Sequence, residues 1–84
     1  MPTQKFIKDI KISKKLSDKS HLIIVSSEID TVGWKFDEEN GLIKLFTIKN
    51  SYEFIDFLPG KNVFVGLRDS GEIEKVNCKT GKIE

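Results

Sequence analysis

The residues of this chain that could support acid–base, nucleophilic or metal chemistry are few and do not form a group. The single histidine, His21, precedes an apolar run and has no sequence cue to a catalytic partner. The single cysteine, Cys78, lies near the other end of the chain, whereas zinc needs three or four Cys, His or carboxylate ligands at suitable spacing. We therefore expect no catalytic site, no metal site and no cofactor.

The acidic run Asp37-Glu38-Glu39 could hold a hard cation, because Ca²⁺ and Mg²⁺ prefer carboxylate oxygens. The run directly precedes Asn40-Gly41, however, and three acids at such a place are typical of a solvated hairpin tip. Gly60, Lys61 and Gly66 do not have the spacing of a phosphate-binding loop.

Aromatic residues gather in the middle of the sequence and leave two interpretations open. Either they form the core, or Trp34 or Tyr52 is an exposed platform on which a nucleobase stacks. In the second case Arg68, the only arginine, would hold a phosphate, because its planar head suits bidentate anion recognition better than lysine does. A surface pair with Asp69 or Glu72 explains Arg68 equally well.

Charge is unevenly distributed, although the net charge is only +1 and the chain as a whole is not the basic type of a general nucleic-acid binder. Residues 1–20 carry six lysines and two aspartates, whereas residues 28–60 carry three lysines and seven acidic residues. The two regions are either solvated faces that attract one another or a basic arm that steers an anionic partner. Lys11, Lys14 and Lys15 are the candidate contacts of such an arm.

Turn signals at short, regular intervals predict a mainly β or α+β domain. Asn40-Gly41 separates residues 34–36 from residues 42–46, and both turn residues tolerate the positive φ of a tight hairpin. Asn50-Ser51 then separates residues 42–46 from residues 52–57. Three strands of an antiparallel meander follow.

The segments on either side of this meander can be read in two ways. Residues 61–68, after a predicted type II turn at Pro59-Gly60, alternate like a strand but could also form one face of a helix; β-branching favours the strand. Residues 5–16 form a helix or, as we favour, a strand paired with residues 22–27. With a last strand at residues 73–78, we predict five to seven short strands, with or without one short helix.

At 84 residues the chain has material for one domain with a modest core, because chains of this size bury only about 60% of their unfolded surface. We expect a single domain over residues 1–84, with a basic arm at 1–20 and a β core at 21–84. A lone cysteine favours a reducing cytoplasm, the host cytoplasm if the chain is phage-encoded. The longest apolar run, Leu22 to Val25, is too short to cross a bilayer.

Five segments from Val25 onward form a recognisable pattern: Ser26-Ser27-x-Ile29-x-x-Val32-Gly33-Trp34, Leu42-x-Lys44-x-Phe46, Tyr52-x-Phe54, Pro59 and Ser70-Gly71. In this pattern the sequence resembles the KTSC domain family, named for its occurrence at the C-terminus of some lysyl-tRNA synthetases. The resemblance implies a helix after Pro59, for which the segment here is short, and a link to RNA through the synthetase context. Trp34 stands where members usually carry tyrosine, and Ser70-Gly71 lacks the residue that members place between the two.

These observations predict a non-catalytic binding domain, an inhibitor or adaptor of a phage or other mobile element that binds an unknown protein partner. Its sheet edges could also pair with a second copy in a homodimer. The alternative is a nucleotide- or RNA-binding domain, and no membrane contact is expected. The candidate ligand- or partner-binding residues are Trp34, Tyr52, Arg68, Ser70, Lys11, Lys14 and Lys15.

Overall fold

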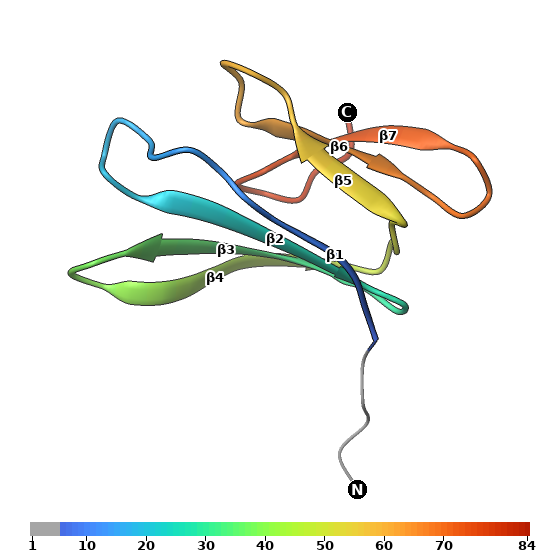
Figure 1. Ribbon diagram of the computed structural model, residues 1–84, viewed down its shortest axis with the longest axis horizontal. Coiled ribbons are helices and arrows are strands. Elements are labelled where there is room, and N and C mark those ends of the chain that lie inside the picture. Colours follow the sequence, from blue (N-terminus) through green and yellow to red (C-terminus); the bar gives the residue numbers. More distant parts are fainter. Residues whose placement is uncertain (1–5) are drawn as a thin grey trace, which may run out of the picture.

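The computed structural model describes residues 6–84, which form seven antiparallel strands in two sheets (Figure 1). The four-stranded sheet has the order β1 (Ile7–Ile12), β2 (His21–Ser27), β3 (Thr31–Asp37) and β4 (Gly41–Ile48). The three-stranded sheet has the order β5 (Phe54–Phe57), β6 (Val63–Leu67) and β7 (Ile73–Asn77). The prediction of a mainly β domain with five to seven short antiparallel strands is confirmed. The predicted meander of three strands is wrong in its last member, because β5 pairs with β6 in the second sheet and not with β4.

The hydrophobic core lies between the two sheets. On β2, Leu22 and Ile24 are buried while Ile23 between them is only partly buried, as expected for a strand whose side chains alternate between two faces. Both sheets contribute to the core, and β1 and β5 are the edge strands at which the sheets approach each other most closely. The fully or largely buried apolar residues are Leu22, Ile24, Phe46, Tyr52, Ile55, Val63, Phe64, Val76 and Cys78.

Both segments that could have been helix or strand are strands. β1 pairs with β2, with Ile10 opposite Val25 and Ile12 opposite Ile23. β6 lies between β5 and β7, so the helix that the family resemblance implies after Pro59 is absent. The basic segment is therefore an edge strand and a loop rather than a separate arm; its Lys5 lies outside the described residues.

The predicted turns after residues 37 and 58 are confirmed. β4 begins at Gly41, whose φ of 70° follows the Asn40-Gly41 prediction. At the second turn the N–H of Lys61 donates to the carbonyl of Leu58, and Gly60 has a φ of 71°, as a type II turn requires.

Two other glycines allow aromatic rings to pack directly against the sheets. A Cβ atom on Gly33 would lie 2.1 Å from the ring of Phe46, and one on Gly66 would lie 2.5 Å from the ring of Tyr52. Next to the first contact, the register of β3 and β4 shifts between Gly33 and Trp34. Residues 6–84 contain no helix that is long and apolar enough to cross a membrane.

Candidate functional site

The outer face of the four-stranded sheet, which points away from the three-stranded sheet, carries apolar side chains on all four strands, and its polar members are His21, Lys44 and Thr47. Because Leu22 and Ile24 point into the core, Ile23 points to the opposite side, and so do the residues that pair with it across the sheet. We call this surface the apolar face. Its members are Ile10 and Ile12 on β1, Ile23 and Val25 on β2, Val32, Trp34 and Phe36 on β3, and Leu42 on β4.

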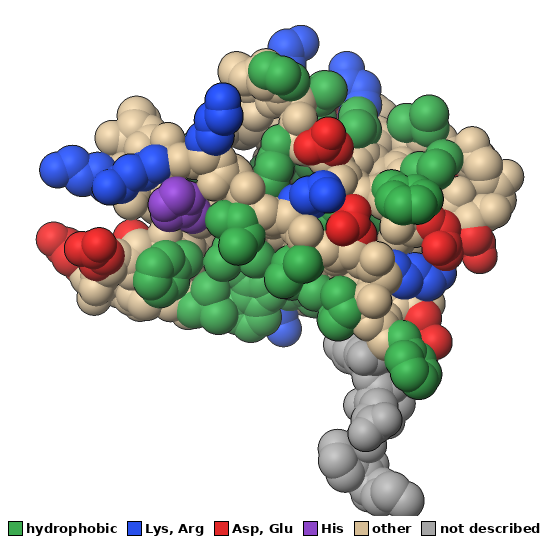
Figure 2. Space-filling model, viewed as in Figure 1, with side chains coloured by type: hydrophobic (Ala, Val, Ile, Leu, Met, Phe, Trp, Pro, Cys, Tyr) green, Lys and Arg blue, Asp and Glu red, His purple; other side chains and the backbone are tan. Residues whose placement is uncertain are grey.

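The apolar face is accessible to solvent. Ile10 is 53% exposed, Ile12 62%, Phe36 42% and Leu42 55%, whereas the four members between them are partly buried by their neighbours. Hydrophobic side chains gather over this sheet, next to the histidine, in Figure 2. A contiguous exposed apolar area of this kind marks an interaction site more often than single exposed residues do.

Trp34 lies in the middle of the apolar face. It is opposite Ile23 on one side and opposite Lys44 on the other. The Nζ atom of Lys44 is 5.9 Å from the centroid of the Trp34 ring, a distance at which the cation is attracted to the π-system. The side chain of Trp34 is therefore partly covered by a lysine and partly open to a partner.

Two loops of opposite charge border one end of the four-stranded sheet. The basic loop, residues 13–20, connects β1 to β2 and carries Lys14, Lys15 and Lys19. The acidic hairpin, residues 37–40, connects β3 to β4 and carries Asp37, Glu38 and Glu39. Within one molecule they flank a cleft of about 550 Å³.

An ion pair fixes the basic loop to β3. Lys35 Nζ is 2.8 Å from a carboxylate oxygen of Asp18, and the hydroxyl and N–H of Ser20 also donate to Asp18. These contacts hold the pKa of Asp18 well below its usual range, with Lys35 the largest cause, and the same pair raises the pKa of Lys35. The loop is thus positioned by contacts that leave Lys14, Lys15 and Lys19 outside the ion pair.

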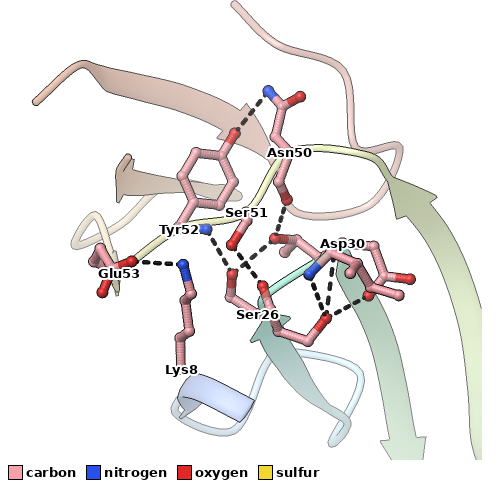
Figure 3. Close-up of polar contacts among 10 residues, drawn as sticks. Lys8, Ser26, Asp30, Asn50, Ser51, Tyr52 and Glu53 are labelled. Carbon is pink, nitrogen blue, oxygen red and sulfur yellow. Dashed lines mark hydrogen bonds and ion pairs between the residues drawn. The ribbon is translucent and has the colours of Figure 1, made fainter. Parts of the chain in front are cut away.

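Buried serine and threonine hydroxyls connect the two sheets (Figure 3). The Oγ atom of Ser26 accepts a hydrogen bond from the N–H of Tyr52 at 2.8 Å and lies 3.0 Å from Oγ1 of Thr31. The hydroxyl of Ser51 donates to the carbonyl of Ser27 at 2.6 Å. We call this cluster the polar joint. Its hydroxyls all have partners within the chain, which is a structural rather than a catalytic arrangement.

Tyr52 extends the polar joint to the three-stranded sheet. Its hydroxyl donates to Glu74 at 2.9 Å, and the side-chain amide of Asn50 donates to the same carboxylate. Burial is the main cause that raises the pKa of Tyr52 to about 12. Nearby, Lys8 on β1 pairs with Glu53, which raises the lysine pKa. These contacts tie the segment that precedes β5 to β1 and to β7.

The structure does not bring the three residues predicted for a nucleobase site together. Tyr52 is 0% exposed and cannot stack on a base, whereas Trp34 lies on the apolar face. Arg68 and Ser70 lie in the turn between β6 and β7, where both approach Glu72: Arg68 at 3.8 Å and the Ser70 hydroxyl at 3.5 Å. Of the two interpretations of Arg68, its geometry fits the surface pair.

The three candidate lysines lie on β1 and in the loop that follows it. Lys11 is 3.7 Å from Asp9, whose other carboxylate oxygen accepts the N–H of Ile55 on β5. Lys14 and Lys15 line a second cleft, of about 450 Å³, between residues 12–16 and 56–62. Lys15 therefore lines both clefts and Lys14 only the second, while Lys11 lies beside the contact between the sheets.

Cys78 and His21, the single residues of their types, each lie in a defined local environment. Cys78 is 0% exposed, and burial raises the pKa of its thiol to about 12, so the nucleophilic thiolate is disfavoured. His21 places Nδ1 3.0 Å from the carbonyl of Ser13. Over residues 6–84, no group of three or more His, Cys, Asp or Glu side chains could hold a metal ion.

The apolar face was missed at the level of sequence, although one signal for it was present. The run from Leu22 to Val25 is apolar at four consecutive positions, which is typical of a strand with apolar surroundings on both sides. A half-exposed strand of a small β domain would instead alternate apolar with polar residues. The apolar run on β2 therefore indicated a second covered face, whereas β3 alternates apolar with polar or small residues.

Comparison of the chain with protein-family models, with curated proteins and with solved structures finds no significant match. The resemblance to the KTSC family thus remains a prediction. Several of the residues that carry it have a structural role here: Ser26, Ser27 and Tyr52 build the polar joint, and Gly33 makes room for Phe46.

Proposed function

We propose that this chain is a non-catalytic binding domain that acts by protein–protein contact, and that the apolar face is its docking surface. The observation that carries the proposal is the set of eight neighbouring apolar side chains on four strands, four of them 42–62% exposed. Burial of apolar surface contributes about 25 cal/mol per Å², so covering this face releases substantial free energy. An inhibitor or adaptor would use such a surface to hold its target.

The chemistry of the apolar face favours a protein over a nucleic acid. Nucleic-acid binding draws most of its affinity from several lysine or arginine contacts to phosphates. Among the described residues of this face, Lys44 is the only lysine, and its ammonium group is already directed at Trp34. Protein interfaces, in contrast, have an apolar centre and a charged rim, which is how the basic loop and the acidic hairpin border this face.

The proposal is tested by comparing two isoleucines that are both exposed and both on edge strands. Ile12→Glu places a charge on the apolar face, whereas Ile73→Glu places the same charge on the three-stranded sheet; these side chains are 62% and 71% exposed. The wild type and both variants are used as baits in a native lysate, and each retained protein is then purified and titrated calorimetrically against all three.

We expect a retained protein to bind the wild type and Ile73→Glu equally and to bind Ile12→Glu at least tenfold more weakly. Equal binding to all three chains would overturn the apolar face as the docking surface. Retention of a nucleotide or RNA in place of a protein, visible as a raised ratio of absorbance at 260 nm to that at 280 nm, would favour the alternative function.

A further inference from the structure

The two charged loops occupy equivalent places on opposite halves of the apolar face. β1 ends at Ile12 and β2 begins at His21, while β3 ends at Asp37 and β4 begins at Gly41, so the basic loop and the acidic hairpin lie at the same end of the sheet (Figure 1). The basic loop belongs to the β1–β2 half and the acidic hairpin to the β3–β4 half. The surface is thus divided into a positive and a negative half about a line between β2 and β3.

A two-fold axis along that line makes the surface complementary to itself. Rotation by half a turn about an axis parallel to the strands keeps each end in place and exchanges the two halves. The β1–β2 half of one copy then covers the β3–β4 half of the other, and each basic loop faces the acidic hairpin of the partner copy. Because a two-fold interface uses the same patch twice, this charge match occurs twice.

The size of the apolar face agrees with such a pairing. Four large side chains at about half exposure, together with four partly buried ones, present on the order of 500 Å² per copy, the upper range for a monomer. Two copies would bury about 1,000 Å², the lower limit for a specific interface, before the loops are counted. An interface of this size is expected to form a dimer that dissociates at low concentration.

We propose that the occupant of the apolar face is a second copy of this chain, related by a two-fold axis that runs parallel to the strands between β2 and β3. This inference rests on the proposed function, because it names the protein that the docking surface binds. Since Ile23 and Trp34 are opposite each other on the two strands beside the axis, Trp34 of each copy packs against Ile23 of the other. The charged loops set the orientation of the pair.

Sedimentation velocity measures the association directly. We expect the wild type to pass from monomer to dimer as its concentration rises from about 1 μM to about 200 μM, the range of affinities for interfaces near this lower size limit. Ile73→Glu should follow the wild type, and Ile12→Glu should shift the midpoint at least tenfold towards higher concentration. A wild type that stays monomeric throughout would overturn the inference.

Charge reversal tests the orientation of the two copies. One variant carries Lys14→Glu and Lys15→Glu in the basic loop, and the other carries Glu38→Lys and Glu39→Lys in the acidic hairpin. Each variant alone opposes like charges across the interface and should dimerise at least tenfold more weakly than the wild type. An equimolar mixture matches opposite charges at both contacts, so a dimer of wild-type affinity should form again.

Attraction between the two loops of one molecule cannot produce this recovery, since neither variant contains both charges. A dimer that forms in the wild type but does not recover in the mixture would overturn the proposed axis. The outcomes also separate this inference from the proposed function. A monomeric chain in which Ile12→Glu abolishes binding of another protein overturns only the second copy as occupant, whereas a monomeric chain in which Ile12→Glu changes no binding overturns both.

Discussion

The outer faces of the two sheets are both open to solvent but differ in composition. On the three-stranded sheet, one cross-strand row is apolar, with Phe54, Leu67 and Ile73, and the next row places Asp56 and Lys75 on either side of Val65. On the four-stranded sheet, two of the three rows of the apolar face are apolar on three neighbouring strands, as in Ile12, Ile23 and Trp34, and the third row places His21 beside Phe36 and Leu42.

This difference in composition shows which apolar residues folding requires and which it does not. An exposed strand position accepts polar side chains at little cost in stability, and the outer face of the three-stranded sheet has accepted them. The core between the sheets would form equally well with such residues on the other side. Folding therefore does not explain the apolar face, whereas a partner that covers it does.

The largest expected effect comes from a substitution on the core side of β3, directly behind the apolar face. Because a Cβ atom on Gly33 would lie 2.1 Å from the ring of Phe46, Gly33→Ala must displace either the ring or β3, at the place where the register shifts before Trp34. Overpacking of this kind costs about 2–3 kcal/mol. Urea unfolding of the variant, at a concentration that keeps the chain monomeric, measures the loss.

A second substitution identifies the cause of that loss. Phe46→Leu removes the ring that the new methyl group meets, so the double variant should be more stable than the sum of the two single effects predicts. Additive losses would show that the Gly33→Ala effect does not come from this contact. The outer face of the three-stranded sheet, which is remote from Gly33, serves as the unchanged reference.

The next effect is the pH dependence of stability that comes from the polar joint, the cluster that connects the two sheets on their inner sides. Burial raises the pKa of Tyr52 to about 12, whereas an unfolded tyrosine ionises near pH 10. Above pH 10 the unfolded chain therefore loses this proton first, and stability falls as the pH rises towards 12, by up to about 2 kcal/mol. Below pH 10 both states keep the proton, so the stabilisation is fully present.

Tyr52 is the only tyrosine, so absorbance near 295 nm follows its ionisation directly. We expect a midpoint well above 10 in the native chain and one near 10 in urea. Tyr52→Phe should lose less stability between pH 10 and pH 12 than the wild type does, and groups such as Cys78 that ionise in both proteins cancel in the difference. A native midpoint near 10 would contradict the buried position of the hydroxyl.

Much of the fold could be predicted because its turns depend on local chemistry. Gly41 and Gly60 adopt the positive φ that their turns require, and a strand lies on either side of each turn. The turn signals do not determine the pairing of those strands, because β4 and β5, predicted as neighbours, lie in different sheets. The segment around Ile10 and Ile12 was ambiguous, because its apolar spacing suits a helix and a strand alike. Its strand conformation depends on pairing with β2, a contact that local spacing does not encode.

The candidate site was less predictable, because burial depends on residues distant in sequence. No local pattern indicates that Ser26 and Glu74 hold Tyr52 inside the molecule, so both a core ring and an exposed platform remained open. Trp34 could be either core or platform at the level of sequence, because its surroundings come from three neighbouring strands. Only the packing of the second sheet decides which side of these strands faces outward.

The smallest expected effect compares one lysine on each outer face. The ammonium group of Lys44 lies 5.9 Å from the centroid of the Trp34 ring, whereas Lys75 pairs across its sheet with Val65. A cation over an exposed indole contributes about 0.5 kcal/mol, and about 2 kcal/mol once the pair is desolvated. Lys44→Gln should therefore cost about 0.5 kcal/mol in dilute solution and more at concentrations where a second copy covers the face.

Lys75→Gln removes the same charge and should change stability less at either concentration. Urea unfolding at two protein concentrations, followed through the emission of the single tryptophan, measures both variants. Equal effects of the two substitutions at both concentrations would mean that the lysine on the apolar face gains nothing from its tryptophan, and that the two outer faces differ in composition without differing in what covers them.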